Sequence, residues 1–282
     1  MPSGQRNVIE WLGEATSGGD ALGGKAASLD RLIRLGYRVP PGFCVTTAAF
    51  RPGAEATESL DAELVDALSA ALDRLEAAVA EVTGGPVRLA VRSSAIGEDG
   101  TAASFAGLHE TELDVAPSDV PAAVRRCWAS LASAPAVAYR ARRGLSEDDV
   151  AMAVVVQALV PADAAAVVFT RHPVTGREEQ LVITAARGLG DAMVAGTMTP
   201  DTFVIDRATG AVVEFTPGEG TGEPVLDAAA LSELVELSLA VERDFGRAVD
   251  IEAAMTGQDW YLLQARPITT GAATGAAMGT PR

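Results

Sequence analysis

Lysine is almost absent from this sequence. Of the 22 basic residues only Lys25 is a lysine, and the others are arginines. Acidic residues number 38, so the formal net charge is −16 at pH 7. Nucleic acids and anionic membranes attract clustered basic side chains, so this charge argues against both as partners. It also repels phosphate compounds at long range, so a site for such a ligand requires positive groups close by.

Cysteine and long apolar runs are scarce as well. Cys44 and Cys127 are the two cysteines, and we expect buried free thiols rather than a disulfide or a metal site. No apolar stretch typical of a signal peptide follows the N-terminus, and polar residues and a proline interrupt the most apolar segment, residues 151–169. We therefore expect a cytoplasmic protein that does not bind membranes.

The length of 282 residues allows about two domains, and the 48% hydrophobic content is sufficient for a sizeable core. Apolar periodicity predicts helices and strands in the first half and mostly strands in the second. The expected class is α+β, with lobes at residues 1–150 and 151–270 and a disordered tail at 271–282. The predicted helices cover residues 25–35, 60–82, 120–143 with a break at Pro135, and 227–245. The predicted strands cover residues 43–46, 87–91, 108–115, 152–160, 165–170, 180–185, 202–206, 211–215, 248–254 and 260–265.

The single lysine follows two glycines at the start of a predicted helix. Ammonium groups on such turns commonly contact phosphate oxygens, which makes Lys25 a candidate anion-binding residue. Chance is the alternative, because one lysine must lie somewhere.

A second candidate anion site follows the predicted strand 87–91. Arg92 comes first, and residues 93–107 are rich in serine, threonine and glycine. A loop of this composition could cover a phosphate chain with backbone amides and hydroxyls. The alternative is a mobile surface loop.

The last two predicted strands carry a repeated polar spacing. Asp250 and Glu252 lie two residues apart, as do Gln264 and Arg266, so each pair projects from one face of its strand. Carboxylate and amide oxygens suit Mg²⁺, and an arginine can bind a phosphoryl group. Solvated acidic residues on an exposed strand face are the alternative.

Seven ordered blocks between about residues 20 and 270 resemble one known family. They resemble the ATP-binding domain of phosphoenolpyruvate synthases, pyruvate phosphate dikinases and rifampin phosphotransferases. The blocks are GGKAASL (23–29) with VPPGF (39–43), RSSA (92–95) with ED (98–99) and SFAG (104–107), FTRHPVTG (169–176), GLG (188–190), TPD (199–201), DIE (250–252) and QARPIT (264–269).

The resemblance implies an ATP-grasp fold, in which two lobes surround a nucleotide cleft, and it implies roles for individual residues. Lys25, Arg92 and Arg266 would be the catalytic residues that hold the ATP phosphates, and Thr111 would contact the phosphates or the sugar. Glu252 and Gln264 would coordinate Mg²⁺. Gln157 and Leu159 would border the adenine, which backbone groups of their strand would recognise.

The chain departs from the family pattern around the expected ribose and adenine surroundings. Leu108, Thr184, Arg187 and Asp191 stand where the family commonly has glutamine, an acidic residue, an aromatic residue and glutamate. The two histidines, His109 and His172, lack the Thr-Ser-His context of the family's phosphohistidine. We expect His172 to be structural and His109 to be a polar residue on a strand edge.

Three functions are compatible with these residues. In the first, the chain binds Mg-ATP and passes a phosphoryl group to a histidine on a separate partner protein. This hypothesis follows from the last family block closing at Thr269, near the end of the sequence. In the second, it is a self-contained ATP-grasp enzyme that phosphorylates or activates a small molecule in specialised metabolism. In the third, it is a non-catalytic nucleotide-binding module.

Overall fold

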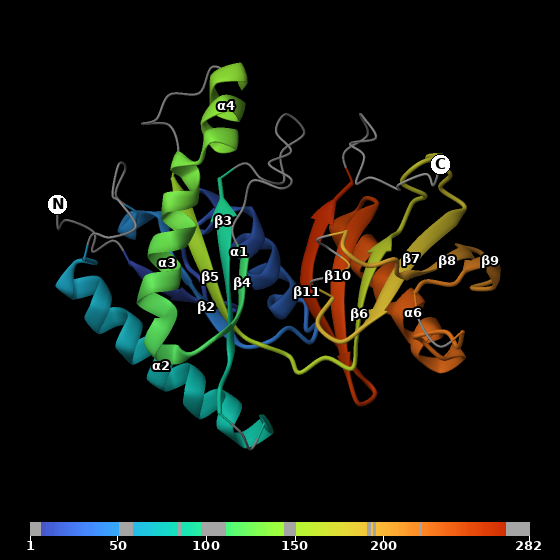
Figure 1. Ribbon diagram of the computed structural model, residues 1–282, viewed down its shortest axis with the longest axis horizontal. Helices are drawn as coiled ribbons and strands as arrows, with labels where there is room; N and C mark the ends of the chain where they lie inside the picture. Colours follow the sequence, from blue (N-terminus) through green and yellow to red (C-terminus); the bar gives the residue numbers. More distant parts are fainter. Residues whose placement is uncertain are drawn as a thin grey trace. The chain divides into compact units, whose positions relative to one another are not determined.

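The chain divides into two compact units. The computed structural model describes residues 7–50, 59–83, 86–96, 111–143, 151–190, 193, 196–219 and 222–268 (Figure 1). Unit 1 is Met1–Leu159 and unit 2 is Val160–Arg282. Residues 97–107 of the expected loop and the expected tail at 271–282 lie outside the described residues.

Unit 1 contains a five-stranded antiparallel sheet in the order β1-β2-β5-β3-β4. The central strand, β5, was assigned to the second lobe by the sequence analysis, and the structure places it in the first sheet. Its continuous apolar run is typical of a strand covered on both faces, which explains its central position. The strands are β1 (Ile9–Trp11), β2 (Gly42–Val45), β3 (Leu89–Ala95), β4 (Thr111–Val115) and β5 (Met152–Ala158).

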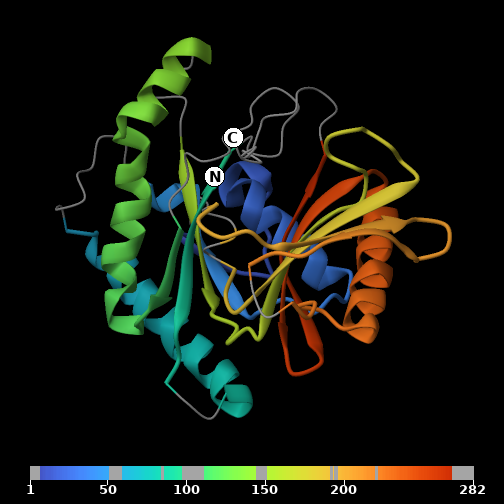
Figure 2. The ribbon, with the colours of Figure 1, turned by 45° about the vertical axis from the view of Figure 1, so that its right-hand side comes forward.

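Helices cover both faces of this sheet (Figure 2). α1 (Gly19–Arg34) packs on β3 and β5 from one side. On the other side, α2 (Ala62–Thr83) and α3 (Val120–Ala129) enclose the main apolar core with the sheet. α4 (Ala134–Arg143) follows α3, and its second residue is Pro135, so the predicted helix break is confirmed.

Strand β3 is longer than the sequence analysis predicted. We expected the strand to end at Val91 and a loop to begin at Arg92, and this prediction is wrong. Arg92, Ser93 and Ser94 continue the ladder with β5. Backbone pairing with a central strand holds these small polar residues in the extended conformation despite their preference for loops.

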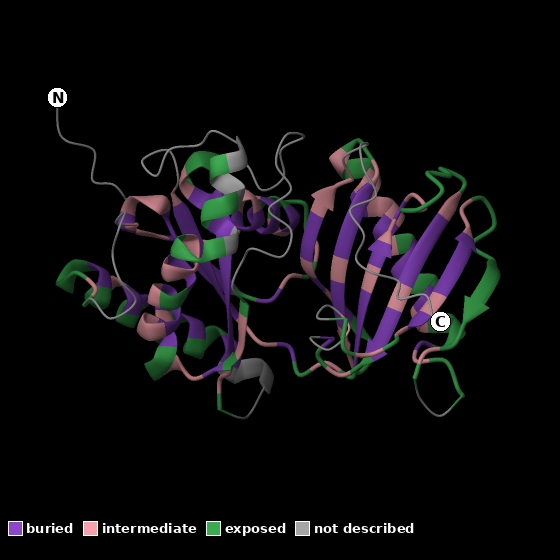
Figure 3. Ribbon diagram, turned by 45° about the horizontal axis from the view of Figure 1, so that its top comes forward, coloured by how far each residue is buried: buried purple, intermediate pink, exposed green. Residues whose placement is uncertain are grey.

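Unit 2 contains a six-stranded antiparallel sheet in the order β11-β10-β6-β7-β8-β9. α6 (Ala228–Phe245) packs on β10 and β11, and the outermost strand β9 is exposed along its length (Figure 3). The α+β class is therefore confirmed. The strands are β6 (Ala164–Phe169), β7 (Gln180–Arg187), β8 (Asp201–Asp206), β9 (Val212–Thr216), β10 (Val249–Thr256) and β11 (Asp259–Pro267).

Two expectations from the composition can be compared directly with this fold. Cys44 and Cys127 are both free and buried, as predicted, and burial raises the pKa of the Cys44 thiol. Within the described part of the chain, every helix is too short or too polar to cross a bilayer.

Candidate functional site

In unit 1, the candidate phosphate-binding residue Arg92 lies on the face of the sheet that α1 covers. Arg92 pairs with Val155 and Ser94 with Ala153, and alternate residues of a strand share a face. Ser94 is hydrogen-bonded to residues of α1, so Arg92 projects from the same face as that helix. The Arg92 side chain is buried there.

Lys25 follows an interruption of α1. Gly23 has φ 71° and ψ 173°, so the helix stops and starts again one residue before Lys25. A Cβ atom on Gly23 would lie 2.1 Å from the carbonyl oxygen of Ser94, so only glycine fits. This close approach brings the start of the second helical segment against β3, and Lys25 is only 8% exposed.

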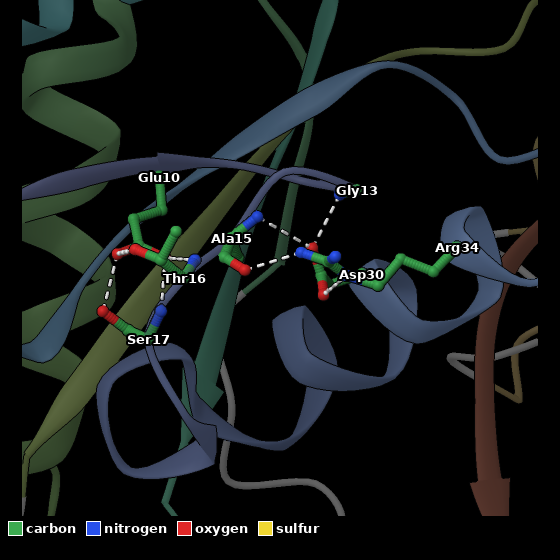
Figure 4. A network of polar contacts seen from close by, with 7 residues as sticks. All are labelled: Glu10, Gly13, Ala15, Thr16, Ser17, Asp30 and Arg34. Atoms are coloured by element: carbon green, nitrogen blue, oxygen red, sulfur yellow. Dashed lines mark hydrogen bonds and ion pairs between the residues drawn. The ribbon is translucent and has the colours of Figure 1, made fainter.

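Two buried carboxylates hold the loop that leads into α1 (Figure 4). Glu10 Oε2 accepts hydrogen bonds from the backbone N–H groups of Thr16 and Ser17 at 2.9 and 3.1 Å. Asp30 Oδ1 accepts from the N–H groups of Gly13 and Ala15 at 2.7 and 3.2 Å. These bonds satisfy backbone donors of residues 13–17 and fix the segment that precedes the Gly-Gly-Lys turn.

Glu10 is ionised in this network. Burial raises the pKa of its carboxyl, but hydrogen bonds from Ser17, Thr16 and Asn7 lower it, and the net pKa lies below the ordinary value. The hydrogen bonds therefore favour the charged form by more than burial disfavours it.

Thr111 and Arg92 are brought together by the pairing of β4 with β3. They are direct cross-strand partners, so their side chains project from the same face. Thr111 is exposed at the start of β4, whereas Arg92 is buried.

The two residues expected beside an adenine are already engaged in unit 1. The Gln157 side-chain amide donates to the carbonyl oxygen of Pro40 at 3.1 Å. The backbone N–H of Leu159 donates to the carbonyl oxygen of Arg88 at 2.9 Å. A nucleotide base recognised by the Leu159 amide would have to replace this bond.

In unit 2, the candidate metal and phosphate ligands share one face of the sheet. Glu252 is the cross-strand partner of Gln264, and Asp250 is the partner of Arg266. Trp260 lies on the other face and donates from Nε1 to the Ala230 carbonyl oxygen in α6 at 3.3 Å. The four polar residues are therefore on the face opposite α6.

Asp250 orients the Arg266 guanidinium. Its Oδ2 atom accepts from Arg266 Nε at 2.8 Å and from Nη2 at 2.7 Å. Burial raises the pKa of Asp250 above its ordinary value, although the Arg266 charge opposes this shift. The Asp250 side chain is 10% exposed, so the ion pair is shielded on the Asp250 side.

The pairing of Glu252 with Gln264 fits a Mg²⁺ site. Cross-strand partners place their Cβ atoms about 5 Å apart, close enough for both side-chain oxygens to reach one ion. The described residues contain no group of three or more His, Cys, Asp or Glu side chains that could hold a metal. Mg²⁺ bound to a nucleotide requires few protein ligands, because phosphates and water supply the others.

Two further positions named in the sequence analysis, Thr184 and Gly190, border this polar face. Thr184 lies in the same cross-strand row as Glu252, with Val167 between them. Gly190 approaches Ala165 on the same face so closely that a Cβ atom would lie 2.5 Å from the alanine methyl group. Gly190 therefore packs against this face.

His172 has the structural role that we expected. Its Nδ1 atom accepts from the backbone N–H groups of Val174 and Thr175 at 3.2 and 3.3 Å, which stabilises the turn between β6 and β7. His109 lies outside the described residues.

Sequence reasoning missed the role of Ser94, which it placed in a loop. The Ser94 hydroxyl joins β3 to α1 across 68 and 72 residues of sequence. A contact between residues so far apart in the sequence leaves no local pattern. The one signal in the sequence was that Gly23, Lys25 and Ser94 all lie in blocks that resemble the family.

Comparisons with known proteins identify the family of this chain. The family described as pyruvate phosphate dikinase, AMP/ATP-binding domain, matches residues 54–221. A prodigiosin synthesizing transferase from Serratia marcescens is 37% identical and aligns with 94% of this chain and 33% of its own length. A probable phosphoenolpyruvate synthase from Methanothermobacter thermautotrophicus is 36% identical and aligns with 88% of this chain and 44% of its own length. A rifampicin phosphotransferase from Streptomyces sviceus is 38% identical and aligns with 88% of this chain and 34% of its own length.

The chain thus spans between a third and a half of the length of these relatives. Among solved structures, the D-alanine–D-alanine ligase from Bacillus anthracis complexed with ATP has a TM-score of 0.37. It is 12% identical, over 88% of this chain and 55% of its own. The family match covers more than half of the sequence, and the chain belongs to the pyruvate phosphate dikinase AMP/ATP-binding domain family.

Proposed function

We propose that this chain is the Mg-ATP-binding component of a phosphoenolpyruvate synthase-like phosphotransferase with an ATP-grasp fold. It passes a phosphoryl group from ATP towards a histidine on a separate partner protein in the cytoplasm. The observation that carries the proposal is the burial of both Lys25 and Arg92 in unit 1, within a family described as AMP/ATP-binding.

The cationic residues supply the phosphate contacts in this proposal. Lys25 and Arg92 are buried cations, and hydrogen bonds from such groups to phosphate oxygens are among the strong ones. Thr111, as the cross-strand partner of Arg92, adds a hydroxyl on the same face. Arg266, held by Asp250, supplies the third cation. Positive groups at these positions stabilise charge that develops during phosphoryl transfer.

Glu252 and Gln264 hold Mg²⁺ in this proposal. Their pairing on one sheet face supports the assignment, and the bound ion would neutralise phosphate charge. Gln157 and Leu159 border the adenine, and the Leu159 amide exchanges its bond with Arg88 for one with the base.

In this proposal the acceptor histidine belongs to another protein, and the contacts of His172, the histidine within the described residues, support this assignment. The Nδ1 atom of His172 is engaged by two backbone amides in a turn, and this supports a structural role rather than phosphoryl transfer. Relatives named as phosphoenolpyruvate synthase and rifampicin phosphotransferase support the phosphoryl-transfer class.

Labelled ATP tests this function. The purified chain with Mg²⁺ and ATP labelled on the β- or γ-phosphate is incubated with and without each protein encoded beside its gene. We expect label to appear as an acid-labile phosphohistidine on one partner, with AMP or ADP as the nucleotide product. Glu252→Ala should abolish the transfer. Turnover that needs no partner protein would contradict the split-enzyme proposal.

A second candidate function has one observation in its favour. One relative is named as a prodigiosin synthesizing transferase, and this name supports a role in the synthesis of a small molecule, which ATP would activate directly in this second proposal. In that case the chain and a small acceptor should consume ATP without any partner histidine. The third hypothesis is a non-catalytic nucleotide-binding module. It predicts that the chain binds ATP but shows no turnover in either assay.

A further inference from the structure

The strongest unassigned feature is the buried hydroxyl of Ser94, beside the interruption of α1. Ser94 Oγ donates a hydrogen bond to the carbonyl oxygen of Leu22 at 2.9 Å. The same oxygen accepts one from the backbone N–H of Ala26 at 3.1 Å. Both bonds are buried, and the Ser94 side chain is fully inaccessible.

Leu22 and Ala26 are four positions apart in the sequence, which is the spacing of a helical hydrogen bond. In a continuous helix the Ala26 N–H would donate to the Leu22 carbonyl oxygen. The backbone of Gly23 turns out of the helical conformation between them. The Ser94 hydroxyl is hydrogen-bonded to both groups at once, so one side chain from β3 bridges the two sides of the interruption.

The second helical segment begins after Gly23, and Ala26 is its third residue. An N-cap side chain normally accepts the bond from this N–H group, but glycine has no side chain. Ser94 therefore acts as the cap from another strand. The requirement for glycine at position 23 comes from the same contact, because Ser94 occupies the space of a Cβ atom.

Lys25 lies between the two groups that Ser94 binds. Arg92 is two residues from Ser94 on the same face of β3, which is about 6.6 Å along a strand. One residue thus sets the distance between the element that carries the lysine and the strand that carries the arginine.

We propose that Ser94 is a positioning residue for the nucleotide phosphates: its hydroxyl holds the Gly23-Gly24-Lys25 turn against β3 so that Lys25 and Arg92 act together. This inference rests on the proposed role of Lys25 in phosphate binding. Ser94 itself need not contact the nucleotide.

The neighbouring serine provides a matched control. Ser93 is also fully buried and projects from the other face of β3, among the residues of the apolar core. Its hydroxyl has no hydrogen-bond partner among the described residues. Ser93→Ala and Ser94→Ala therefore delete the same atom from adjacent positions, but only the second removes the bridge to α1.

The test compares dissociation constants for ATP and for adenosine in four variants: Ser93→Ala, Ser94→Ala, Lys25→Ala and the Lys25→Ala/Ser94→Ala double variant. We expect Ser94→Ala to weaken ATP binding about three- to tenfold, since two hydrogen bonds are lost, and to leave adenosine binding unchanged. Ser93→Ala should stay within about twofold of the parent protein for both ligands. In the Lys25→Ala background, Ser94→Ala should have little further effect, because coupled residues are not additive.

Three results would overturn the inference. Equal weakening of ATP and adenosine by Ser94→Ala would show a general structural role, and an undiminished effect without Lys25 would show that the two residues are independent. An unchanged ATP affinity in Ser94→Ala would show that the turn needs no bridge. If Ser94→Ala does not fold, Ser94→Cys retains a weaker donor and acceptor and should give a smaller, ATP-selective loss.

Failure of the proposed function is distinguishable from failure of this inference. If Lys25→Ala leaves ATP affinity unchanged, the phosphate assignment of Lys25 is wrong and the role of Ser94 is lost with it. If Lys25→Ala weakens ATP binding and Ser94→Ala does not, only the inference about Ser94 is wrong.

Discussion

The two units position their candidate cationic residues by different means. In unit 1, the turn that carries Lys25 is held by a neutral hydroxyl, Ser94, through bonds to backbone groups. In unit 2, the Arg266 guanidinium is held directly by the charge of Asp250. The first arrangement fixes the backbone beneath a side chain, whereas the second fixes the side chain itself.

This difference predicts different sensitivities. The Ser94 hydroxyl carries no charge that acid could remove, so protonation should not break the hydroxyl bridge itself. An ion pair depends on the protonation state of its acid, and Asp250 is a buried carboxylate with a raised pKa. The polar face of unit 2 should therefore respond first when acid is added.

The largest expected effect tests the metal assignment in unit 2. Glu252→Ala removes the one carboxylate of the Glu252–Gln264 pair, and Mg-dependent turnover should be abolished. Nucleotide binding without metal should fall much less, because the arginines and Lys25 remain. Turnover assays and calorimetry with and without Mg²⁺ measure the two quantities. Glu214→Ala, on the exposed strand β9, is the matched control. Full activity of Glu252→Ala would contradict the assignment of Glu252 as a Mg²⁺ ligand.

The next effect tests the cations of unit 1. Lys25→Ala and Arg92→Ala should each weaken ATP binding by about 1.5 to 3 kcal/mol, the usual range for a lost hydrogen bond to a charged group. Arg126→Ala removes an arginine that forms an exposed pair with Glu112, and ATP binding should stay nearly constant. Titration calorimetry gives the three affinities. Equal affinities for all three variants would refute the phosphate assignment.

A smaller effect tests the ion pair of unit 2. Asp250→Asn keeps the shape of the side chain but removes its charge. Because folding raises the Asp250 pKa and so disfavours the charged form, the free energy of unfolding at pH 7 should rise, by about 1 kcal/mol. The exposed pair of Arg126 with Glu112 is the reference, since Glu112→Gln should cost less than about 1 kcal/mol. Urea denaturation measures both. If the two variants are equally stable, burial of Asp250 does not distinguish its ion pair from an exposed one.

The smallest effect concerns the carboxylate network of unit 1 and depends on pH. The pKa of Glu10 in the folded chain lies below its ordinary value of 4.5. The stabilisation from its charged form is thus complete above about pH 4.5 and is lost as the pH falls through the lower folded pKa. Glu10→Gln should reduce stability by about 1 kcal/mol at pH 7.

Urea denaturation of the same variant at decreasing pH completes this test. The difference from the parent protein should shrink below pH 4.5, because protonation removes the charge from Glu10 in the parent as well. Glu14→Gln, in an exposed pair with Arg74, should show little effect at any pH. A difference that stays constant with pH would mean that Glu10 stabilises the loop by its shape alone.

Much of the secondary structure follows from local patterns. The predicted helix at residues 60–82 corresponds to α2 (Ala62–Thr83), and that at 227–245 corresponds to α6 (Ala228–Phe245). Long periodic segments with clear stop signals are predictable because their energetics are local. The three-residue strand β1 was not predicted, since it is too short to show a period and depends on β2 for its hydrogen bonds.

The face of a strand on which a residue lies was predictable, whereas the register between paired strands was not. The period of two placed Asp250 and Glu252 on one strand face and Gln264 and Arg266 on another. Only the register of β10 with β11 decides that Glu252 lies opposite Gln264. Likewise, only pairing with β5 keeps Ser94 in a strand rather than in the predicted loop.

The sequence by itself determined the α+β class, most of the elements and the family, because these depend on composition, periodicity and ordered motifs. The tertiary structure decided which residues support the motifs. Ser94 lies 72 residues from Leu22, and Asp30 lies 17 residues from Gly13, yet both pairs are hydrogen-bonded. Such contacts form only when packing brings distant segments together, and their hydrogen bonds are strong because burial excludes competing water.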